Sequence, residues 1–362
     1  MRTIFIVSED LAGKACKYDT CLASEVNEKD KNIKYINCDG ITDINDLDLI
    51  AKNSVSRYIN KFLDNLERNE RQEVIKTGFD NFDKNLGGGI YPGLYCIGAI
   101  SSLGKTALSL QIADNVASSG QHVLFFSLEM PIDELISRTI SRELFIKDFE
   151  KWKHAGTRSI LMNKIHGNDF NEVLSTYENS IAKNLTIVDT GFNTKVTKIC
   201  EKIKNFVNLT GLKPLVMIDY LQVIKPELKA GYSDKQAIDD IVVKLKMLSR
   251  ELNLPIFIIS SFNRQNYSTH VNFECFKESG CIEYTCDVVM GLQLSVLDNP
   301  EIENAKNKNE YIRSAKEKEA REITLVTLKN RNGKAYTKTK MIFYARNNLF
   351  KESNNTFDEI TK

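Results

Sequence analysis

The chain has 362 residues, enough for about two domains of ordinary size with a sizeable hydrophobic core. Its 49 Lys and Arg residues balance 48 Asp and Glu residues, and the formal charge of +1 excludes a histone-like polycation, although a local basic surface is compatible with that total. Hydrophobic residues at 42% and charged residues at 27% exclude a wholly disordered chain.

The chain also lacks the marks of export and of membrane insertion. No apolar run approaches the roughly 20 residues that cross a bilayer, and residues 1–10 turn acidic after one short apolar run, without a cleavage site. We therefore expect a cytoplasmic protein with no membrane segment. The eight cysteines form no Cys-x-x-Cys pair, so we expect free thiols and no structural metal site.

The first part of the chain differs in pattern from the rest. Apolar residues predict strands at residues 3–7 and 33–36, and polar residues with a helical stretch follow the first of them. We place a small α/β segment at residues 1–52 and a linker helix at residues 53–75. The apolar face of that helix is formed by Val55, Ile59, Phe62, Leu63 and Leu66, which recur at helical spacing.

A different rhythm begins near residue 78. Short, nearly all-apolar runs alternate with helix-length segments, which is typical of a mainly parallel sheet buried under helices on both faces. The runs are residues 94–99, 123–128, 185–188, 215–218, 255–260 and 288–292. Residues 301–322 are rich in Lys and Glu and predict a solvated helix or a long loop.

Residues 98–106 read Gly-Ala-Ile-Ser-Ser-Leu-Gly-Lys-Thr, directly after an apolar run and before an amphipathic pattern. This is the context of a Walker A loop, in which backbone N–H groups at a helix start hold phosphate oxygens. Lys105 is then expected to reach the β- and γ-phosphates, and the Thr106 hydroxyl to ligate Mg²⁺. The general motif has glycine where this chain has alanine at position 99. The expected nucleotide-binding residues are Gly98, Ala99, Ser101, Ser102, Leu103, Gly104, Lys105, Thr106 and Ala107.

Two carboxylates end later apolar runs. Asp219 follows the run at residues 214–218, where a carboxylate orients Mg²⁺ and its waters in P-loop proteins. Glu129 follows the run at residues 125–128 and is expected to polarise the attacking water. The alternative for Glu129 is a helix N-terminal acid favoured by the dipole, because a helical pattern follows Pro131.

With these residues, the chain resembles the C-terminal ATPase domain of DnaB-type replicative helicases. The resemblance runs from about residue 76 to residue 350. Alanine at position 99 is the residue that this family usually carries. The segments that carry the resemblance are 77–80 (TGFD), 86–89 (LGGG), 99, 125–130 (FFSLEM), 218–222 (IDYLQ), 263–264 (NR), 277–280 (KESG) and 329–333 (KNRNG).

The resemblance implies a RecA-like P-loop fold, with a mainly parallel central sheet flanked by helices, over residues 76–352 and a C-terminal tail at residues 353–362. It implies a homo-oligomer, a hexameric ring with ATP and Mg²⁺ between subunits. It assigns the phosphates to Lys105, the metal to Thr106 and Asp219, and the attacking water to Glu129. The catalytic set is completed by Lys329 and Arg331, which would reach the γ-phosphate of a neighbour and which a turn at residues 332–333 would present.

The family's channel loop implies the DNA-binding residues. They are Arg264, Lys277, Glu278 and Gly280, although for Arg264 an ion pair with an acid is an equal alternative. A lysine and exposed amides hold the backbone of single-stranded DNA without reading bases. Residues 323–351 contain seven Lys and Arg and no acid, a pattern explained equally by phosphate contacts and by solvated strand faces.

One position departs from the family. Ser261 stands where members usually carry glutamine, a residue thought to report the γ-phosphate to the DNA-binding loops. A short hydroxyl does not span the same gap, so this position puts the coupling, rather than hydrolysis, in question.

The N-terminal segment resembles the second half of a Toprim primase domain over residues 4–46. Ser8 stands where the first aspartate of the metal motif belongs, and the preceding half with its glutamate is missing. Because one carboxylate makes a poor two-metal site, we do not expect polymerisation by this chain.

The expected function is that of an ATP-dependent replicative DNA helicase that translocates on single-stranded DNA. A primase and a helicase loader are the further partners that this function implies. Two alternatives remain open: a RecA/RadA-like recombinase ATPase, against which residues 218–222 and 329–333 argue, and a nucleotide-gated scaffold that binds DNA or a primase without unwinding, which Ser261 favours.

Overall fold

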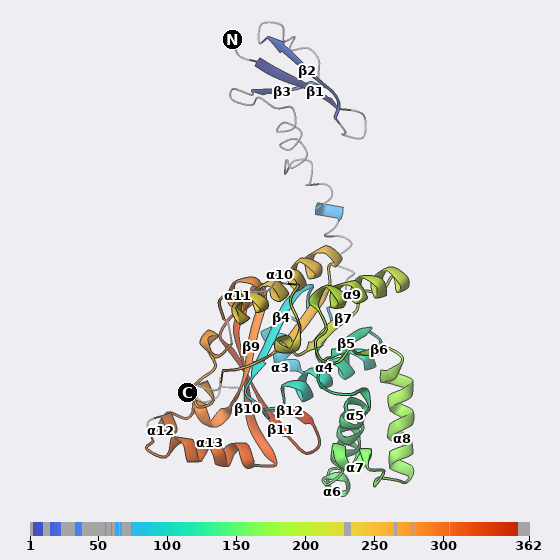
Figure 1. Ribbon diagram of the computed structural model, residues 1–362, viewed down its shortest axis with the longest axis vertical. Coiled ribbons are helices and arrows are strands. Elements are labelled where there is room, and N and C mark those ends of the chain that lie inside the picture. The colour runs from blue at the N-terminus through green and yellow to red at the C-terminus, as the bar shows by residue number, and fades with distance from the viewer. Residues whose placement is uncertain are drawn as a thin grey trace. The chain divides into compact units, whose positions relative to one another are not determined.

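The computed structural model describes most of the chain and divides it into two compact units, Met1–Glu73 and Val74–Lys362 (Figure 1). The described residues are 3–9, 15–22, 33–37, 55, 59, 62–64, 66 and 74–353, except for residues 228–232, 264–265, 277–278 and 304. Among them, no helix combines the length and the apolar character that crossing a membrane requires. The two units are described one at a time.

The first unit contains a three-stranded sheet in the order β2-β1-β3. Strands β1 (Thr3–Glu9) and β3 (Ile33–Asn37) confirm the two predicted strands, and β1 pairs antiparallel with both neighbours. The helical stretch expected after the first strand is wrong where β2 (Ala15–Leu22) lies. Its sequence alternates Cys, Tyr, Thr and Leu with Lys and Asp, a period of two that favours a strand.

The proposed linker helix is described only in part. Residues 55, 59, 62–64 and 66 are helical, and the five apolar side chains of the expected face are exposed. The Toprim-like resemblance and the domain boundaries stay predictions.

The second unit is built on a nine-stranded sheet in the order β12-β11-β10-β9-β4-β8-β7-β5-β6. Six neighbouring strands, from β9 to β6 in that order, are parallel. Each confirms a predicted apolar run, and every residue of β4, β5, β7 and β9 is buried. They are β4 (Gly93–Ala99), β5 (Val123–Ser127), β6 (Leu185–Asp189), β7 (Leu215–Asp219), β8 (Pro255–Ser261) and β9 (Val288–Leu294).

Three antiparallel strands complete the sheet on one side. They are β10 (Ala320–Asn330), β11 (Thr337–Tyr344) and β12 (Leu349–Glu352). The hairpin expected at residues 332–333 is confirmed as the β10–β11 connection, but it spans residues 331–336 and is wider than a two-residue turn. The lysine-rich stretch contains helices α12 (Pro300–Glu303) and α13 (Lys308–Glu317), and its last residues already belong to β10.

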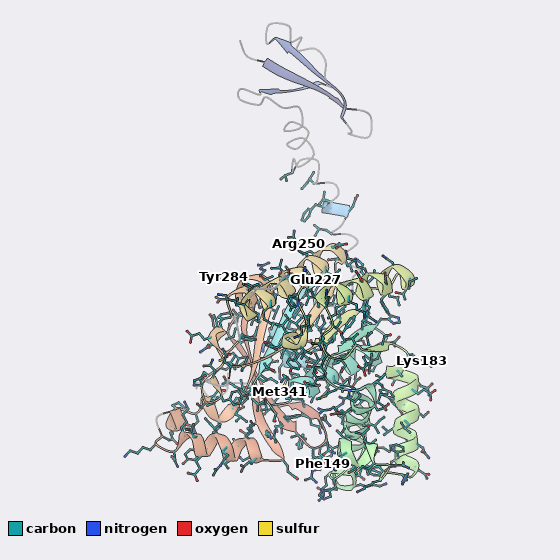
Figure 2. All side chains as sticks on the ribbon, viewed as in Figure 1. Phe149, Lys183, Glu227, Arg250, Tyr284 and Met341 are labelled. Atoms are coloured by element: carbon teal, nitrogen blue, oxygen red, sulfur yellow. The ribbon has the colours of Figure 1, made fainter. Side chains whose placement is uncertain are left out.

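Helices cover both faces of the parallel strands. The crossover from β4 to β5 through α4 (Lys105–Ser118) runs in one direction along the sheet, whereas those through α9 (Val196–Thr210) and α10 (Asp234–Leu252) run in the other. Because such crossovers are right-handed, α4 lies on one face and α9 and α10 on the opposite face. Side chains fill the space between these layers (Figure 2). The remaining helices are α3 (Asp80–Asn85), α5 (Ile132–Lys147), α6 (Phe149–Trp152), α7 (Thr157–Leu161), α8 (Asn168–Thr176) and α11 (Ser279–Thr285).

A buried ion pair joins α4 to α5. Arg142 Nη2 lies 2.6 Å from Asp114 Oδ2, and both side chains are 1% exposed. The Thr139 hydroxyl donates a hydrogen bond to the same oxygen at 2.7 Å. The pair therefore fixes α5 against the helix that begins at the predicted phosphate loop.

Candidate nucleotide site and interface edge

A turn with two left-handed residues joins β4 to α4 at residues 100–104. The backbone φ is 67° at Ser102 and 85° at Gly104, a region that glycine adopts without strain. A Cβ atom on Gly104 would lie 2.7 Å from the ring of Phe343 and 2.8 Å from that of Phe350, so this position also lacks space for a side chain. The first turn of α4 has neither a side-chain cap nor an acidic residue, which leaves its backbone N–H groups for an anion.

Lys105, Thr106 and Asp219 meet beside this turn. Within the described part of the chain, the Lys105 ammonium makes no hydrogen bond or ion pair, and it lies 5.6 Å from the ring centroid of Tyr220. Asp219 is 3% exposed, and its Oδ1 atom has no hydrogen-bond partner among the described residues. Burial raises the pKa of Asp219 to about 6, against the lowering effect of a hydrogen bond with Thr106 and of the Lys105 charge. An unpaired buried carboxylate oxygen beside a hydroxyl is a donor set that suits Mg²⁺.

Glu129 lies at the same edge of the sheet. Ser127 at the end of β5 pairs with Asp219 at the end of β7, and the Leu128 N–H donates to the Asp219 carbonyl at 2.9 Å. The exposed Glu129 follows directly, and its charge contributes to the raised pKa of Asp219. Helix α5 begins only at Ile132, so Glu129 precedes the first helical turn that the alternative role requires.

The first two residues of the predicted loop belong to the strand. Gly98 and Ala99 are the last residues of β4, and Ala99 is fully buried. A Cβ atom on Gly98 would lie 2.1 Å from the ring of Phe262 and 2.5 Å from that of Phe276. Close packing therefore accounts for this glycine.

A pocket of about 450 Å³ opens beside the phosphate loop. The sequence analysis missed its four arginines, because they come from distant segments and match no motif. Arg321 Nη1 donates to the Ser102 carbonyl of the loop at 2.7 Å, and Arg138 Nη1 donates to Asn348 Oδ1 at 3.2 Å. Arg138, Arg158, Arg321 and Arg346 thus surround one opening next to the loop.

The predicted DNA-binding residues are described only at one position. Arg264, Lys277 and Glu278 lie outside the described residues. Gly280 lies at the start of α11, and apart from its chain neighbours and its own helix backbone, no described atom lies within 4 Å of a Cβ built on it. The rings of Phe262 and Phe276, which flank these segments, pack edge to face at 5.0 Å.

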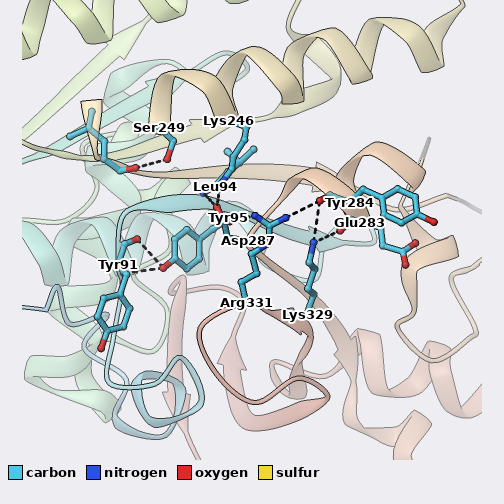
Figure 3. Close-up of polar contacts among 11 residues, drawn as sticks. Tyr91, Leu94, Tyr95, Lys246, Ser249, Glu283, Tyr284, Asp287, Lys329 and Arg331 are labelled. Carbon is cyan, nitrogen blue, oxygen red and sulfur yellow. Dashed lines mark hydrogen bonds and ion pairs between the residues drawn. The ribbon is translucent and has the colours of Figure 1, made fainter. Parts of the chain in front are cut away.

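Lys329 and Arg331 bind the end of α11 in their own chain (Figure 3). Lys329 Nζ donates to the Glu283 carbonyl at 2.5 Å and to the Tyr284 carbonyl at 3.3 Å. Arg331 Nη2 donates to the Tyr284 carbonyl at 3.3 Å, while Nη1 lies 3.1 Å from Asp287 Oδ1. Burial, followed by the Arg331 charge, lowers the pKa of Lys329. The pairing of β10 with β9 shifts register between Thr327 and Lys329, directly before the lysine.

These two cations lie at the opposite edge of the sheet from the phosphate loop. The Leu94 N–H at the start of β4 donates to Asp287, the residue that also binds Arg331, whereas the loop follows the end of β4. At about 3.3 Å per residue, β4 separates the two edges by about 20 Å. An arginine side chain does not cover that distance, so Arg331 does not reach the phosphate loop of its own chain.

The fold and the loop define a P-loop nucleotide-binding domain with a RecA-like sheet. The family model described as "DnaB-like helicase C terminal domain" matches residues 74–352, and the chain belongs to that family, as the sequence predicted. It is similar to the replicative DNA helicase DnaB of Geobacillus stearothermophilus, at 28% identity over 304 residues, covering 82% of this chain and 61% of the relative. The replicative DNA helicase DnaC of Bacillus subtilis (strain 168) is 27% identical with the same coverage. The chain thus spans about three fifths of the length of these relatives.

Two solved structures share the fold. The ATPase domain of G40P has a TM-score of 0.64 at 23% identity, covering 82% of this chain and 98% of that one. A DnaB-like replicative helicase, solved with its interactions with primase, has a TM-score of 0.62 at 23% identity, covering 82% of this chain and 66% of that one. They confirm the predicted fold class.

Proposed function

We propose that this chain is the motor of an ATP-dependent replicative DNA helicase that encircles single-stranded DNA as a ring and separates the duplex. One observation carries the proposal. The phosphate loop lies at one edge of the sheet, whereas Lys329 and Arg331, each hydrogen-bonded within its own chain, lie at the other. The loop of one copy and the two cations of another would form a complete ATP site only where two copies meet. In a closed ring, every copy has a neighbour on each side, so every site is complete.

At the loop edge, Lys105 and the backbone N–H groups of the α4 start would hold the phosphates of ATP. Thr106 and Asp219 would hold Mg²⁺, for which the unpaired Asp219 Oδ1 atom leaves a coordination position. The ion, when bound, neutralises charge on the phosphates. Glu129 would accept the proton of the attacking water. The pocket of about 450 Å³ beside the loop has the size that a nucleoside needs.

At the other edge, Lys329 and Arg331 would reach the γ-phosphate of the neighbouring copy. A cation supplied in trans stabilises the charge of the transition state and makes turnover depend on assembly. A hexamer is the ring that the family resemblance implies.

The channel residues Arg264, Lys277, Glu278 and Gly280 would hold the backbone of single-stranded DNA. We extend the proposal to a primase and a helicase loader as partners in the cytoplasm. A related structure describes interactions with primase for its own protein, which supports the first of these partners.

A fork-unwinding assay with ATP and Mg²⁺ tests the proposal, together with sizing of the assembly. The unsubstituted chain should form a ring and separate the fork, and Lys105→Ala should not separate it. The control is Lys213→Ala, at an exposed lysine far from Lys105 in sequence, which should behave as the unsubstituted chain. ATP turnover without strand separation would favour the scaffold alternative. Filament growth with strand exchange would favour the recombinase alternative.

A further inference from the structure

Asp287 lies at the amino edge of the sheet, where the parallel strands begin, and contacts several of the segments that meet there. It lies between α11 and β9, and its side chain is 10% exposed. Oδ1 lies 3.1 Å from Arg331 Nη1, whereas Oδ2 accepts the Leu94 N–H at 2.8 Å and pairs with Lys246 of α10. Its main chain adds two bonds, from its N–H to the Leu94 carbonyl at 2.8 Å and from the Arg331 N–H to its carbonyl at 2.9 Å. One residue therefore connects β4, β9, α10 and the turn after β10.

The neighbouring backbone is shaped for this carboxylate. A Cβ atom on Gly93 would lie 2.9 Å from Asp287 Oδ2 and 3.3 Å from its Cγ atom. The φ angle of Gly93 is not positive, so its backbone conformation does not demand glycine. The close approach of Asp287 is what excludes a side chain at this position.

Arg331 is held on one side and open on the other. Its side chain is 52% exposed, whereas that of Lys246, which shares the carboxylate, is 17% exposed. A guanidinium has five N–H donors, and the described contacts of Arg331 use one each on Nη1 and Nη2. Donors therefore remain for a second anion while the carboxylate orients the group.

We infer that Asp287 is a positioning residue that holds Arg331 ready for the ATP site of the neighbouring copy. The inference rests on the proposed function, in which Arg331 acts in trans. A free arginine side chain samples many rotamers, and one held in a single arrangement loses less freedom when it meets a phosphate. The competing explanation is an ion pair that stabilises its own subunit and has no effect on the partner's site.

Mixed assemblies separate these explanations. A Lys105→Ala chain keeps Arg331 but lacks the loop lysine, and an Arg331→Ala chain keeps the loop but lacks the arginine. Their mixture should regain ATPase activity that neither chain has alone, because some interfaces pair an intact loop with an intact arginine. Asp287→Asn is then added to one chain or to the other.

In the arginine-donating chain, Asp287→Asn should lower the regained activity about tenfold, as removal of an orienting partner does at other sites. In the loop-donating chain, it should change the activity less than about twofold. Gly93→Ala in the arginine donor, which displaces the carboxylate without removing a charge, should give a smaller loss in the same direction. Asp298→Asn in the arginine donor is the matched control, because Asp298 is equally buried and pairs with Lys338.

Equal losses in the two placements, or no loss in the arginine donor, would overturn the inference and leave the trans site standing. Gly93→Ala decides the case where Asp287→Asn does not fold, as judged by thermal unfolding. A mixture that regains no activity at all would instead overturn the trans arrangement of the proposed function, and the inference with it.

Discussion

The polar groups differ in pairing between the two edges of the parallel strands. Those at the carboxyl edge, where the strands end, are unpaired among the described residues, and those at the amino edge, where the strands begin, are paired within the chain. At the carboxyl edge, Lys105, Glu129 and Asp219 Oδ1 have no hydrogen-bond or ion-pair partner within the described part of the chain. At the amino edge, Lys329 and Arg331 both bind carbonyls of α11, and Arg331 also binds Asp287. Under the proposed function, the unpaired groups would bind ATP and Mg²⁺, and the paired cations would reach the ATP site of another copy.

Arg331→Ala tests this division most strongly. We expect ATP turnover to fall about 10³-fold, because the transition state loses the cation supplied in trans, while the affinity for ATP changes little. Lys105→Ala should instead lower both, because it removes a phosphate contact in the bound ground state. Turnover and equilibrium nucleotide binding are measured on the same preparations, with Arg313→Ala on the exposed face of α13 as control. Loss of ATP affinity in Arg331→Ala would show that the two edges do not divide the work in this way.

Arg142→Met tests the buried ion pair that joins α5 to α4, the helix that begins at the phosphate loop. It leaves Asp114 buried without its partner, which should lower the free energy of unfolding by about 3–5 kcal/mol at pH 8. Burial raises the pKa of Asp114 and the Arg142 charge lowers it, so without Arg142 the folded-state pKa rises further above the unfolded value. An acid with a raised folded-state pKa destabilises the fold as the pH rises through that pKa. The loss should therefore shrink as the pH falls from 8 to 5.

Denaturant unfolding at several pH values measures this effect. The control is the double variant Asp114→Asn with Arg142→Met, which removes both charges and should recover most of the stability at every pH. A loss that is independent of pH would indicate that packing of Arg142, rather than its charge, holds α5 to α4.

Asp219→Asn and Asp287→Asn should shift stability in opposite directions. Asp219 is a buried carboxylate with an unpaired oxygen, so asparagine should raise the free energy of unfolding by about 1–2 kcal/mol in the absence of nucleotide, although turnover is lost. Asp287 is a paired carboxylate, so asparagine there should lower it by about 1–2 kcal/mol. Thermal unfolding at pH 7.5 compares them, and shifts of the same sign would contradict the distinction between an open and a held edge.

The groups at the carboxyl edge follow from local sequence patterns, whereas at the amino edge the family resemblance named Lys329 and Arg331 but not the residues that hold them. The six parallel strands are nearly all-apolar runs. Asp219 ends one of them, Glu129 comes just after another, and Lys105 belongs to the phosphate-loop motif that follows a third, so local patterns place all three. The ties of Arg331 depend on Asp287 and Lys246, which match no motif and meet only because β4, β9 and α10 pack together. The pocket arginines escaped prediction for the same reason. Strand β2 was missed because its period of two lies among polar residues.

The sequence alone shows that Ser261 departs from the glutamine usual in the family. The structure adds the hydrogen bonds that hold this end of β8. The Ser261 N–H donates to Gln222 Oε1 at 3.2 Å, and Gln222 Nε2 donates to the Ser260 hydroxyl at 2.8 Å. These bonds fix the end of β8 through Ser260 and the backbone of residue 261. The Ser261 side chain itself is half-buried, and within the described part of the chain its hydroxyl makes no hydrogen bond.

Ser261→Gln should therefore restore coupling with a small effect. We expect the stimulation of ATP turnover by single-stranded DNA to rise about threefold, with the rate in the absence of DNA unchanged within about twofold, because coupling contributions of single positions are of that order. Ser261→Leu is the matched control, since leucine adds length without an amide and should give no increase. Equal stimulation in the two variants would show that side-chain length alone is responsible. Unchanged stimulation by single-stranded DNA in Ser261→Gln would mean that the ATP site is coupled to DNA binding through contacts other than those at the end of β8.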